Sequence, residues 1–323
     1  MTGHRVVVAS AAVHELAEGP RWDDTTQTVS WVDIRKGEVF QGVLDADAVT
    51  VTQRHDVDDT VGAALPSTDD GLIVAAHDRL VAVAADGSRR ATGPLIDRER
   101  MLRLNDAAVD PLGRVFVGSL ATDHRAGAAA LFRLEDDGAV TTVRAGLDLA
   151  NGIGWSPDGR TMYLADSMAS TVWKASYDVD SGEPHSWSPL VSVPGGLPDG
   201  LCVDTEGRLW VAIWNGARVD CVAPTGELLD TIAMPVPHVT AVAFVGPHRD
   251  RLLVTSARDE LDDAARARYP DSGRLFLVDV TATGLPTSRW RTATDGSGWH
   301  DVPQPPDILR TTQPGRAADP PRL

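Results

Sequence analysis

Short apolar runs separated by turn residues recur along the whole chain. A representative stretch covers residues 149–167, with the sequence LANGIGWSPDGRTMYLADS. Two apolar runs, 153–155 and 162–165, flank a Ser-Pro-Asp-Gly turn at 156–159. Proline presets φ for such a turn and glycine accepts a positive φ, so the pattern predicts a β-hairpin. A polar residue, Asn151, stands at the head of the first predicted strand.

This hairpin pattern recurs, and each copy has its own residue at the head of its first strand. The heads follow one another at intervals of about 41 to 48 residues, which is the period of propeller blades that hold four strands each. In chain order the heads are Glu18, Gly62, Asn105, Asn151, Asp199 and Thr240. Six copies therefore predict an all-β protein, a six-bladed β-propeller.

Further strand candidates fill each repeat to four strands, as residues 130–134 and 140–143 do in the third copy. An apolar strand at 5–9 precedes the first head. We expect it to pair with the last blade, because closure of the ring removes an exposed sheet edge. The propeller is expected to span residues 1–289 as a single domain. The alternative interpretation is a pair of stacked β-sandwich domains.

Two segments fall outside the repeat pattern. Residues 259–268, DELDDAARAR, are a helix candidate in an insertion of the sixth repeat. From residue 290 to residue 323 the chain is rich in Pro, Asp, Arg and Gly and has no hydrophobic period. We expect this C-terminal extension to be irregular, either wrapping the surface or remaining disordered.

The composition narrows the class of protein. The chain has 323 residues, a formal net charge of −16 and a pI near 4.9, and this acidity argues against nucleic acid as a partner. No run of about twenty apolar residues occurs, so no membrane span is expected. Residues 1–12 lack the layout of a secretion signal, which leaves a cytoplasmic localisation as the expectation. Cys202 and Cys221 match no CxxC metal pattern, and whether they pair is left open.

The heads carry the candidate chemistry. In a propeller the innermost strand of each blade starts near the central channel, so the residues at its head converge there. Two carboxylates and two carboxamides, from Glu18, Asn105, Asn151 and Asp199, would then face one cavity. Such hard oxygen donors suit Ca²⁺, Mg²⁺ or Mn²⁺, and carboxylates also suit Zn²⁺. The alternative is that these Asn and Asp residues only cap turns.

Four motifs surround these heads in the order of the chain. They are Glu18-Gly19-Pro20-x-Trp22, Arg103-Leu104-Asn105-Asp106, NGIGWSPDG at 151–159 and Pro198-Asp199-Gly200-Leu201. Each motif alone is weak evidence, but the ordered set resembles the SMP-30/gluconolactonase/luciferin-regenerating enzyme family. With further matches the resemblance runs over residues of about 14 to 280, which is most of the chain.

The resemblance implies a six-bladed propeller with one catalytic divalent metal ion. On the matching motifs, Glu18, Asn151 and Asp199 would be the metal ligands. Arg103 and Asn105 would hold substrate oxygens. The identity of the metal stays open among Ca²⁺, Zn²⁺, Mg²⁺ and Mn²⁺.

A further candidate comes from a weaker match. The family often has an acidic residue shortly after a Gly-Ser/Thr-Met segment. Here Leu120 stands in place of the Met, and the acid that follows is the shorter Asp123. The resemblance therefore makes Asp123 a candidate substrate contact, on a motif that departs from the family pattern.

The leading functional prediction is a metal-dependent hydrolase that opens a sugar or related small lactone to the hydroxy acid. A divalent metal would polarise the lactone carbonyl and lower the pKa of water. Asp199 would take the proton of that water, and Arg103 would help to stabilise the oxyanion. No Gly-x-Ser-x-Gly elbow is present in the sequence, which argues against serine-hydrolase chemistry.

Two other functions stay open at this point. One is a calcium-dependent, phosphotriesterase-like hydrolase. The other is a non-enzymatic calcium-binding or scaffold propeller, although a pure scaffold would need no convergent oxygen donors. The expected partner is a small-molecule lactone, and the protein is expected to be a monomer or a weak homo-oligomer.

Overall fold

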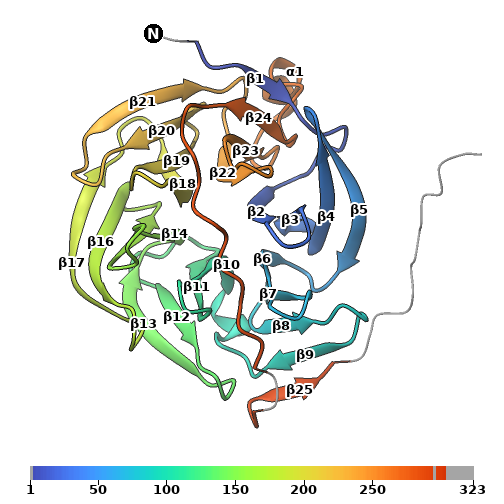
Figure 1. The fold of residues 1–323 in the computed structure, drawn as a ribbon, viewed down its shortest axis with the longest axis vertical. Helices are drawn as coiled ribbons and strands as arrows, with labels where there is room; N and C mark the ends of the chain where they lie inside the picture. Colours follow the sequence, from blue (N-terminus) through green and yellow to red (C-terminus); the bar gives the residue numbers. More distant parts are fainter. Residues whose placement is uncertain (1–2, 294–295, 303–323) are drawn as a thin grey trace, which may run out of the picture.

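The strands form six small antiparallel sheets that stand in a ring around a central axis (Figure 1). This computed structural model describes residues 3–293 and 296–302. The predicted all-β fold, a six-bladed β-propeller, is confirmed. Among the described residues no helix is long and apolar enough to cross a membrane.

Blades 1 to 5 are each built on four consecutive strands of a meander, and the first strand of each meander lies nearest the axis (Figure 1). Blades 1 to 3 consist of β2 (Ala17–Asp23), β3 (Thr28–Asp33), β4 (Glu38–Asp45) and β5 (Ala48–Asp56); β6 (Val61–Pro66), β7 (Leu72–Ala76), β8 (Leu80–Val83) and β9 (Arg89–Thr92); and β10 (Leu102–Val109), β11 (Val115–Ala121), β12 (Ala129–Leu134) and β13 (Val140–Leu147). Blades 4 and 5 consist of β14 (Ala150–Trp155), β15 (Thr161–Asp166), β16 (Thr171–Asp178) and β17 (Glu183–Ser192); and β18 (Leu197–Val203), β19 (Leu209–Trp214), β20 (Arg218–Val222) and β21 (Leu228–Ala233).

Blade 6 is built from both ends of the propeller sequence. Its strands β22 (Val239–Val245), β23 (Arg251–Ser256) and β24 (Phe276–Asp279) come late in the chain, and β1 (Val6–Val8) supplies the outermost strand. β1 pairs antiparallel with β24, with Val7 opposite Leu277. The expected closure of the ring by the N-terminal strand is confirmed, and it covers the edge that β24 would otherwise expose.

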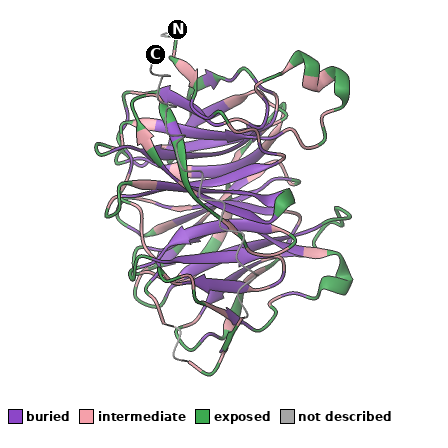
Figure 2. Ribbon diagram, turned by 90° about the vertical axis from the view of Figure 1, so that its right-hand side faces the viewer, coloured by how far each residue is buried: buried purple, intermediate pink, exposed green. Residues whose placement is uncertain are grey.

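The core lies between neighbouring blades, because each sheet packs on both of its faces. In β7, Ile73 and Ala75 join a cluster shared with blade 3. Leu72, Val74 and Ala76 alternate with them and join a cluster shared with blade 1. Both faces of such a strand are buried, which explains why the sequence shows continuous apolar runs. Figure 2 shows the result, with buried strands and exposure mostly in the loops and outer strands.

The innermost strand of every blade is interrupted near its head. The pairing register with the second strand shifts between Glu18 and Arg21, between Leu104 and Ala107 and between Ala150 and Ile153. Corresponding shifts occur in β6, β18 and β22. A β-bulge of this kind leaves residues unpaired and redirects their side chains. The repeated bulge is the local device that places each head at the channel.

The helical segments are short and lie in loops. They are η1 (Ile34–Lys36), η2 (Arg98–Arg100) and α1 (Asp263–Arg268). The predicted helix at 259–268 is helical only in its second half, where the Asp262 side chain accepts a hydrogen bond from the Ala265 backbone N–H and caps the first turn. Both cysteines are free thiols.

After blade 6 the chain crosses the middle of the ring (Figure 1). We call residues 281–293 the strap. The Gly284 N–H donates to the Arg249 carbonyl at 2.7 Å, and the Trp290 N–H donates to the Pro66 carbonyl at 2.8 Å. These bonds tie the strap to blades 6 and 2, which stand at different places around the ring.

The start of the C-terminal extension is ordered by pairing and by burial. β25 (Trp299–Asp301) adds a fifth strand to blade 2 by pairing antiparallel with β9. Trp290 and Trp299 are buried in the core between blades 2 and 3, with ring centroids 5.7 Å apart. Residues from 303 onward, which the sequence assigned to the same extension, lie outside the described residues.

Trp299→Ala should lower the free energy of unfolding by about 3 kcal/mol or more, because truncating a large buried aromatic side chain leaves a cavity. Urea denaturation followed by far-UV circular dichroism measures this loss. Arg291→Ala is the control: its side chain is 58% exposed and pairs with the exposed Asp136, so its loss should cost less than about 1 kcal/mol. Equal stability of the two variants would contradict a structural role for the extension.

Candidate functional site

A cavity of about 350 Å³ opens at the end of the channel where the innermost strands begin. Its lining includes four of the six heads, Glu18, Asn105, Asn151 and Asp199. The buried polar side chains of Arg103 and Ser167 lie beside them. The structure therefore brings the predicted oxygen donors of four blades into one place.

Among the three predicted metal ligands, Asp199 interacts with each of the other two. The Asn151 Nδ2 amide donates to Asp199 Oδ1, and it also lies 3.1 Å from Ser167 Oγ. The Glu18 and Asp199 carboxyls are within hydrogen-bonding reach of each other. Each of the three side chains is at most 6% exposed. Residues 181 positions apart in the sequence thus form one compact, nearly dry cluster of oxygen atoms.

This cluster fits a divalent cation. Asn151 Oδ1 is buried and accepts no hydrogen bond in the described structure, and a buried polar atom without a partner is costly. A cation between Glu18, Asn151 and Asp199 would satisfy that atom and offset the two carboxylates. Carboxylate and carboxamide oxygens are donors for hard ions. Among the described residues no group of three or more His, Cys, Asp and Glu side chains is placed to hold a metal ion.

The acidity of the two carboxyls reflects their surroundings. Burial, together with the smaller effect of the nearby Asp106 carboxylate, raises the pKa of Glu18 to about 8. Burial also raises the pKa of Asp199 well above its ordinary range, with Glu18 and Asp106 adding to the effect. Without a cation, the cluster therefore holds a proton near neutral pH, since two close carboxylates in a dry site cannot both ionise.

Arg103 and Asn105 form the next part of the site. Arg103 Nη1 donates to Asn105 Oδ1 at 2.9 Å and to the Leu104 carbonyl at 3.0 Å. The Asn105 Nδ2 amide donates to the Ala150 carbonyl at 3.1 Å, which ties blade 3 to blade 4. Burial lowers the pKa of Arg103 to about 10, so the guanidinium is still charged at neutral pH. A fixed cation thus lines the cavity next to the acidic cluster.

Asp123 lies apart from this group. It does not line the cavity, and its carboxylate pairs with Arg125 at 2.7 Å on the surface. Its neighbours Thr122 and His124 do line the cavity. The structure therefore brings Glu18, Arg103, Asn105, Asn151 and Asp199 together and leaves Asp123 outside.

The two remaining heads have structural roles. A Cβ atom on Gly62 would lie 2.2 Å from the Asn105 carbonyl oxygen, so only glycine lets blades 2 and 3 approach so closely. Thr240 Oγ1 donates to the Ala17 carbonyl at 2.6 Å and fastens blade 6 to blade 1. These two heads therefore keep neighbouring blades close together at the same end of the channel where the other four heads present oxygen atoms.

The sequence reasoning missed several residues of the cavity. Ser167 Oγ donates to the Pro198 carbonyl at 2.7 Å and accepts a hydrogen bond from the Asn151 amide. These two bonds fix the orientation of that amide. Leu16, Leu149 and Leu197 line the cavity, and each stands two residues before a head. This shared offset within the repeat is a signal that would have identified them.

The outer part of the cavity joins blades 1 and 6. Asp259 and Glu260, which begin the insertion before α1, line it together with Arg35 of η1. Arg35 and Asp259 form an ion pair at 2.6 Å. His238 stacks on Trp214 with ring centroids 4.0 Å apart and bonds to the Asp259 carbonyl through Nδ1 at 3.0 Å. His238 therefore supports the insertion that borders the cavity.

Comparison with known proteins agrees with this architecture. Residues 16–258 match the profile of the SMP-30/gluconolactonase/LRE-like region. This chain belongs to that family. The matched segment begins two residues before Glu18 and extends two residues past Ser256, the end of β23, so it contains every head and every residue of the candidate site except Asp259 and Glu260.

Two relatives show how far the similarity extends. The chain is 37% identical to pentonolactonase XacC of Haloferax volcanii over 298 residues, which cover 90% of this chain and 98% of the relative. It is 32% identical to regucalcin of Danio rerio over 279 residues, covering 84% of this chain and 92% of regucalcin. Both similarities span nearly the whole of the related proteins.

Solved structures give the same picture of the fold. A luciferin-regenerating enzyme superposes with a TM-score of 0.82 at 30% identity, covering 90% of this chain and all of the enzyme. Regucalcin of Agrobacterium tumefaciens, described as a calcium-binding protein, superposes with a TM-score of 0.81 at 27% identity, with 90% and 98% of the two chains covered.

The raised pKa of Glu18 predicts how stability depends on pH. Between about pH 4.5 and 8 the folded protein without metal retains a proton that the unfolded chain releases, so rising pH destabilises the folded state. The unfolding temperature of chelator-treated protein should therefore fall with rising pH more steeply in the wild type than in Glu18→Gln, which lacks the Glu18 proton. Thermal unfolding at pH 5, 6, 7 and 8 tests this, and identical pH profiles for the two proteins would contradict it.

Proposed function

We propose that this protein is a metal-dependent lactonase that opens a small sugar lactone to the corresponding hydroxy acid. The observation that carries the proposal is the buried, unsatisfied Asn151 Oδ1 between two carboxylates, on a cavity that also contains a fixed arginine. The cavity volume of about 350 Å³ is in the range of small-molecule sites. The similarity to a protein named pentonolactonase, along almost its full length, supports the same reaction class.

The metal ligands would be Glu18, Asn151 and Asp199. A divalent cation held by their oxygens supplies Lewis acidity, which polarises a lactone carbonyl and makes water more acidic. The Asn151 amide nitrogen is engaged by Ser167 Oγ and by Asp199 Oδ1, so Oδ1 is the atom of this side chain that would bind the cation. The side chain is thereby oriented before any ligand arrives.

Asp199 would be the general base. Its carboxyl lies on the cavity and contacts both other ligands. Burial favours its protonated form, and a base whose pKa lies above that of an ordinary aspartate is a better proton acceptor. The proton that Asp199 takes from water would later go to the leaving alkoxide, which becomes the hydroxyl of the opened product.

Arg103 and Asn105 would hold the substrate. The Arg103 guanidinium is fixed by bonds from Nη1 to Asn105 and to the Leu104 carbonyl. An arginine fixed in this way donates to sugar hydroxyls or to the oxyanion that forms as the ring opens. Asp123 has no part in this proposal, because its carboxylate is engaged by Arg125 outside the cavity.

A substrate panel tests the reaction class. Chelator-treated protein should show no hydrolysis of five- and six-carbon aldonolactones, and added Ca²⁺, Mn²⁺, Mg²⁺ or Zn²⁺ should restore it, as measured by the acid released at constant pH. Phosphotriesters with the same metals form the second arm. Turnover of phosphotriesters but of no lactone would replace the proposal with the other hydrolase class, and turnover of neither would leave a binding protein.

Paired variants test the roles of two heads. Asp199→Asn keeps an oxygen for the cation but removes the base, so kcat on the best lactone should fall by about 10²- to 10⁴-fold. Asn105→Ala should mainly raise KM, because Asn105 supports Arg103 rather than the cation. Both are compared at saturating metal, with metal content measured on the same samples. A metal-loaded Asp199→Asn with near wild-type kcat would exclude Asp199 as the base, and loss of metal from Asn105→Ala would place Asn105 among the ligands.

A further inference from the structure

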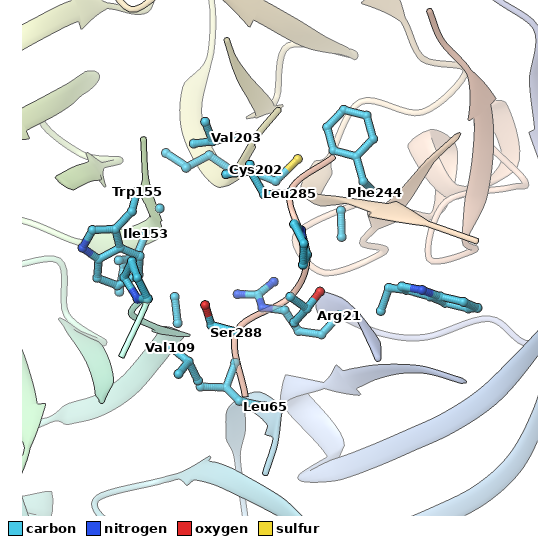
Figure 3. A pocket seen from close by; sticks show the side chains of 18 of the residues that line it. Arg21, Leu65, Val109, Ile153, Trp155, Cys202, Val203, Phe244, Leu285 and Ser288 are labelled. Carbon is cyan, nitrogen blue, oxygen red and sulfur yellow. The ribbon is translucent and has the colours of Figure 1, made fainter. Parts of the chain in front are cut away.

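The channel has a second cavity at the end opposite to the candidate site, where the innermost strands end. Its volume is also about 350 Å³, and its lining is mostly apolar, with Ile153 and Phe244 among it. Residues 285–288 of the strap run along it. Figure 3 shows the strap passing across this cavity, with the Arg21 side chain close to Ser288. An apolar lining of this kind does not suit the hydroxyl groups of a sugar lactone.

Arg21 lies between the two cavities. Its Nη2 donates to Asp106 Oδ1 at 3.0 Å and to the Ala107 carbonyl at 2.8 Å, so a side chain of blade 1 is bonded to blade 3 across the channel. Among the described residues none lines both cavities. A lactone would therefore reach the site through the cavity that contains the heads.

That cavity has a buried floor and an exposed rim. Glu18 and Asp199, on the floor, are at most 6% exposed, and Arg103 is 7% exposed. Glu260, on the rim, lines the same cavity and is an exposed residue. The proposed reaction requires the lactone carbonyl at the floor, so the carbons farthest from that carbonyl would point toward the rim. The rim therefore meets the part of the substrate that does not react.

The backbone fixes Glu260 at this rim. The Leu261 N–H donates to the Arg258 carbonyl at 3.1 Å and closes a turn in which Glu260 is the third residue. Glu260 has a φ of 63°, in the left-handed region that favours glycine at this position of a turn. The Arg258 and Asp259 N–H groups both donate to the Glu15 carbonyl at 2.9 Å, which anchors the turn to the segment before blade 1. A glutamate is thus held beside the cavity in a conformation that costs free energy.

Glu260 carries the unbalanced charge of the rim. Arg35 and Asp259 form an ion pair at 2.6 Å and so offset each other. The Glu260 carboxylate forms no hydrogen bond or ion pair within the part of the chain that the structure describes. His124 lines the cavity from blade 3 and adds no charge while its imidazole is neutral. At the floor, the divalent cation of the proposed function would offset the two carboxylates, which leaves the Arg103 charge. The cavity is then positive at the reacting end and negative at the mouth.

We propose that Glu260 is a specificity-determining residue that makes the site select lactones without an anionic group at the end away from the reacting carbonyl. A phosphate on the terminal hydroxyl of an aldonolactone would lie at the rim beside the Glu260 carboxylate, and like charges repel. An uncharged terminal hydroxyl meets no such repulsion. The proposal rests on the lactonase reaction of the proposed function and names the substrate class of the same site, sugar lactones that are not phosphorylated.

The repulsion should appear in KM rather than in kcat. The terminal phosphate stays beside Glu260 in the bound substrate and in the transition state, so the repulsion weakens the binding of both equally. Because Glu260 is exposed, salt should screen the repulsion. A purely structural role of Glu260 would alter KM for both kinds of lactone alike and would not depend on salt.

Two lactones that differ by one phosphate test the proposal. We would measure kcat and KM on a six-carbon aldonolactone with and without a terminal phosphate, at saturating metal and at pH 8, above the usual range for histidine protonation. The specificity ratio is kcat/KM for the phosphorylated lactone divided by kcat/KM for the neutral one. Glu260→Gln should raise this ratio about fivefold, and Glu260→Lys about tenfold or more, through a lower KM for the phosphorylated lactone. Raising NaCl from about 0.02 to 0.5 M should increase the ratio more in the wild type than in Glu260→Gln.

Two further variants serve as controls. Glu227→Gln removes a charge from another exposed glutamate, which does not line the cavity, and its ratio should equal that of the wild type. Glu260→Gly removes the charge and suits the positive φ, so it decides the matter if Glu260→Gln does not fold.

The outcomes separate this proposal from the proposed function. A wild-type ratio in Glu260→Gln, or an equal rise in Glu227→Gln, would overturn the role of Glu260 while leaving the lactonase reaction intact. A wild type that prefers the phosphorylated lactone would do the same. Turnover of neither lactone by the wild type would overturn the proposed function and this proposal together.

Discussion

The contact between Glu18 and Asp199 at the channel is the constraint on which the rest of the site depends. Two carboxyls that are each at most 6% exposed lie within hydrogen-bonding reach of one another. Such a pair costs free energy unless a proton or a cation separates the charges. Asn151 adds a buried oxygen without a partner at the same place. The cluster is therefore an arrangement that a divalent cation would complete.

The fold keeps this unfavourable cluster together. Each blade packs on both neighbours, so the position of a head depends on the whole ring rather than on one sheet. β1 closes the last blade, and the strap ties blades 6 and 2 across the far end of the channel. Gly62 permits the close approach of blade 3, and Thr240 fastens blade 6 to blade 1. The energy that holds two carboxyls together thus comes from apolar burial between blades.

The sequence predicted the features that recur in every blade, but it could not predict the side-chain contacts between different blades. The heads Glu18, Asn105, Asn151 and Asp199 stand in register, so the fold and the candidate cluster followed from one period. Arg21 and Asp106 form an ion pair although they lie 85 positions apart and on different blades. Neither of the motifs that contain them predicts this contact. Trp290 and Trp299 lie in a segment without a hydrophobic period, so their burial depends on a surface built by other blades. Asp123 was suggested by a motif that departs from the family pattern, and its side chain faces Arg125 instead.

The central claim is that Glu18, Asn151 and Asp199 hold one divalent cation. Anomalous diffraction from crystals soaked in Mn²⁺ tests it most directly, because the signal locates the ion without reference to activity. The account predicts a single strong peak in the channel, at about 2.0 to 2.6 Å from an oxygen of each of the three side chains. A map without a peak among them, or with its peak at other residues, would contradict the account.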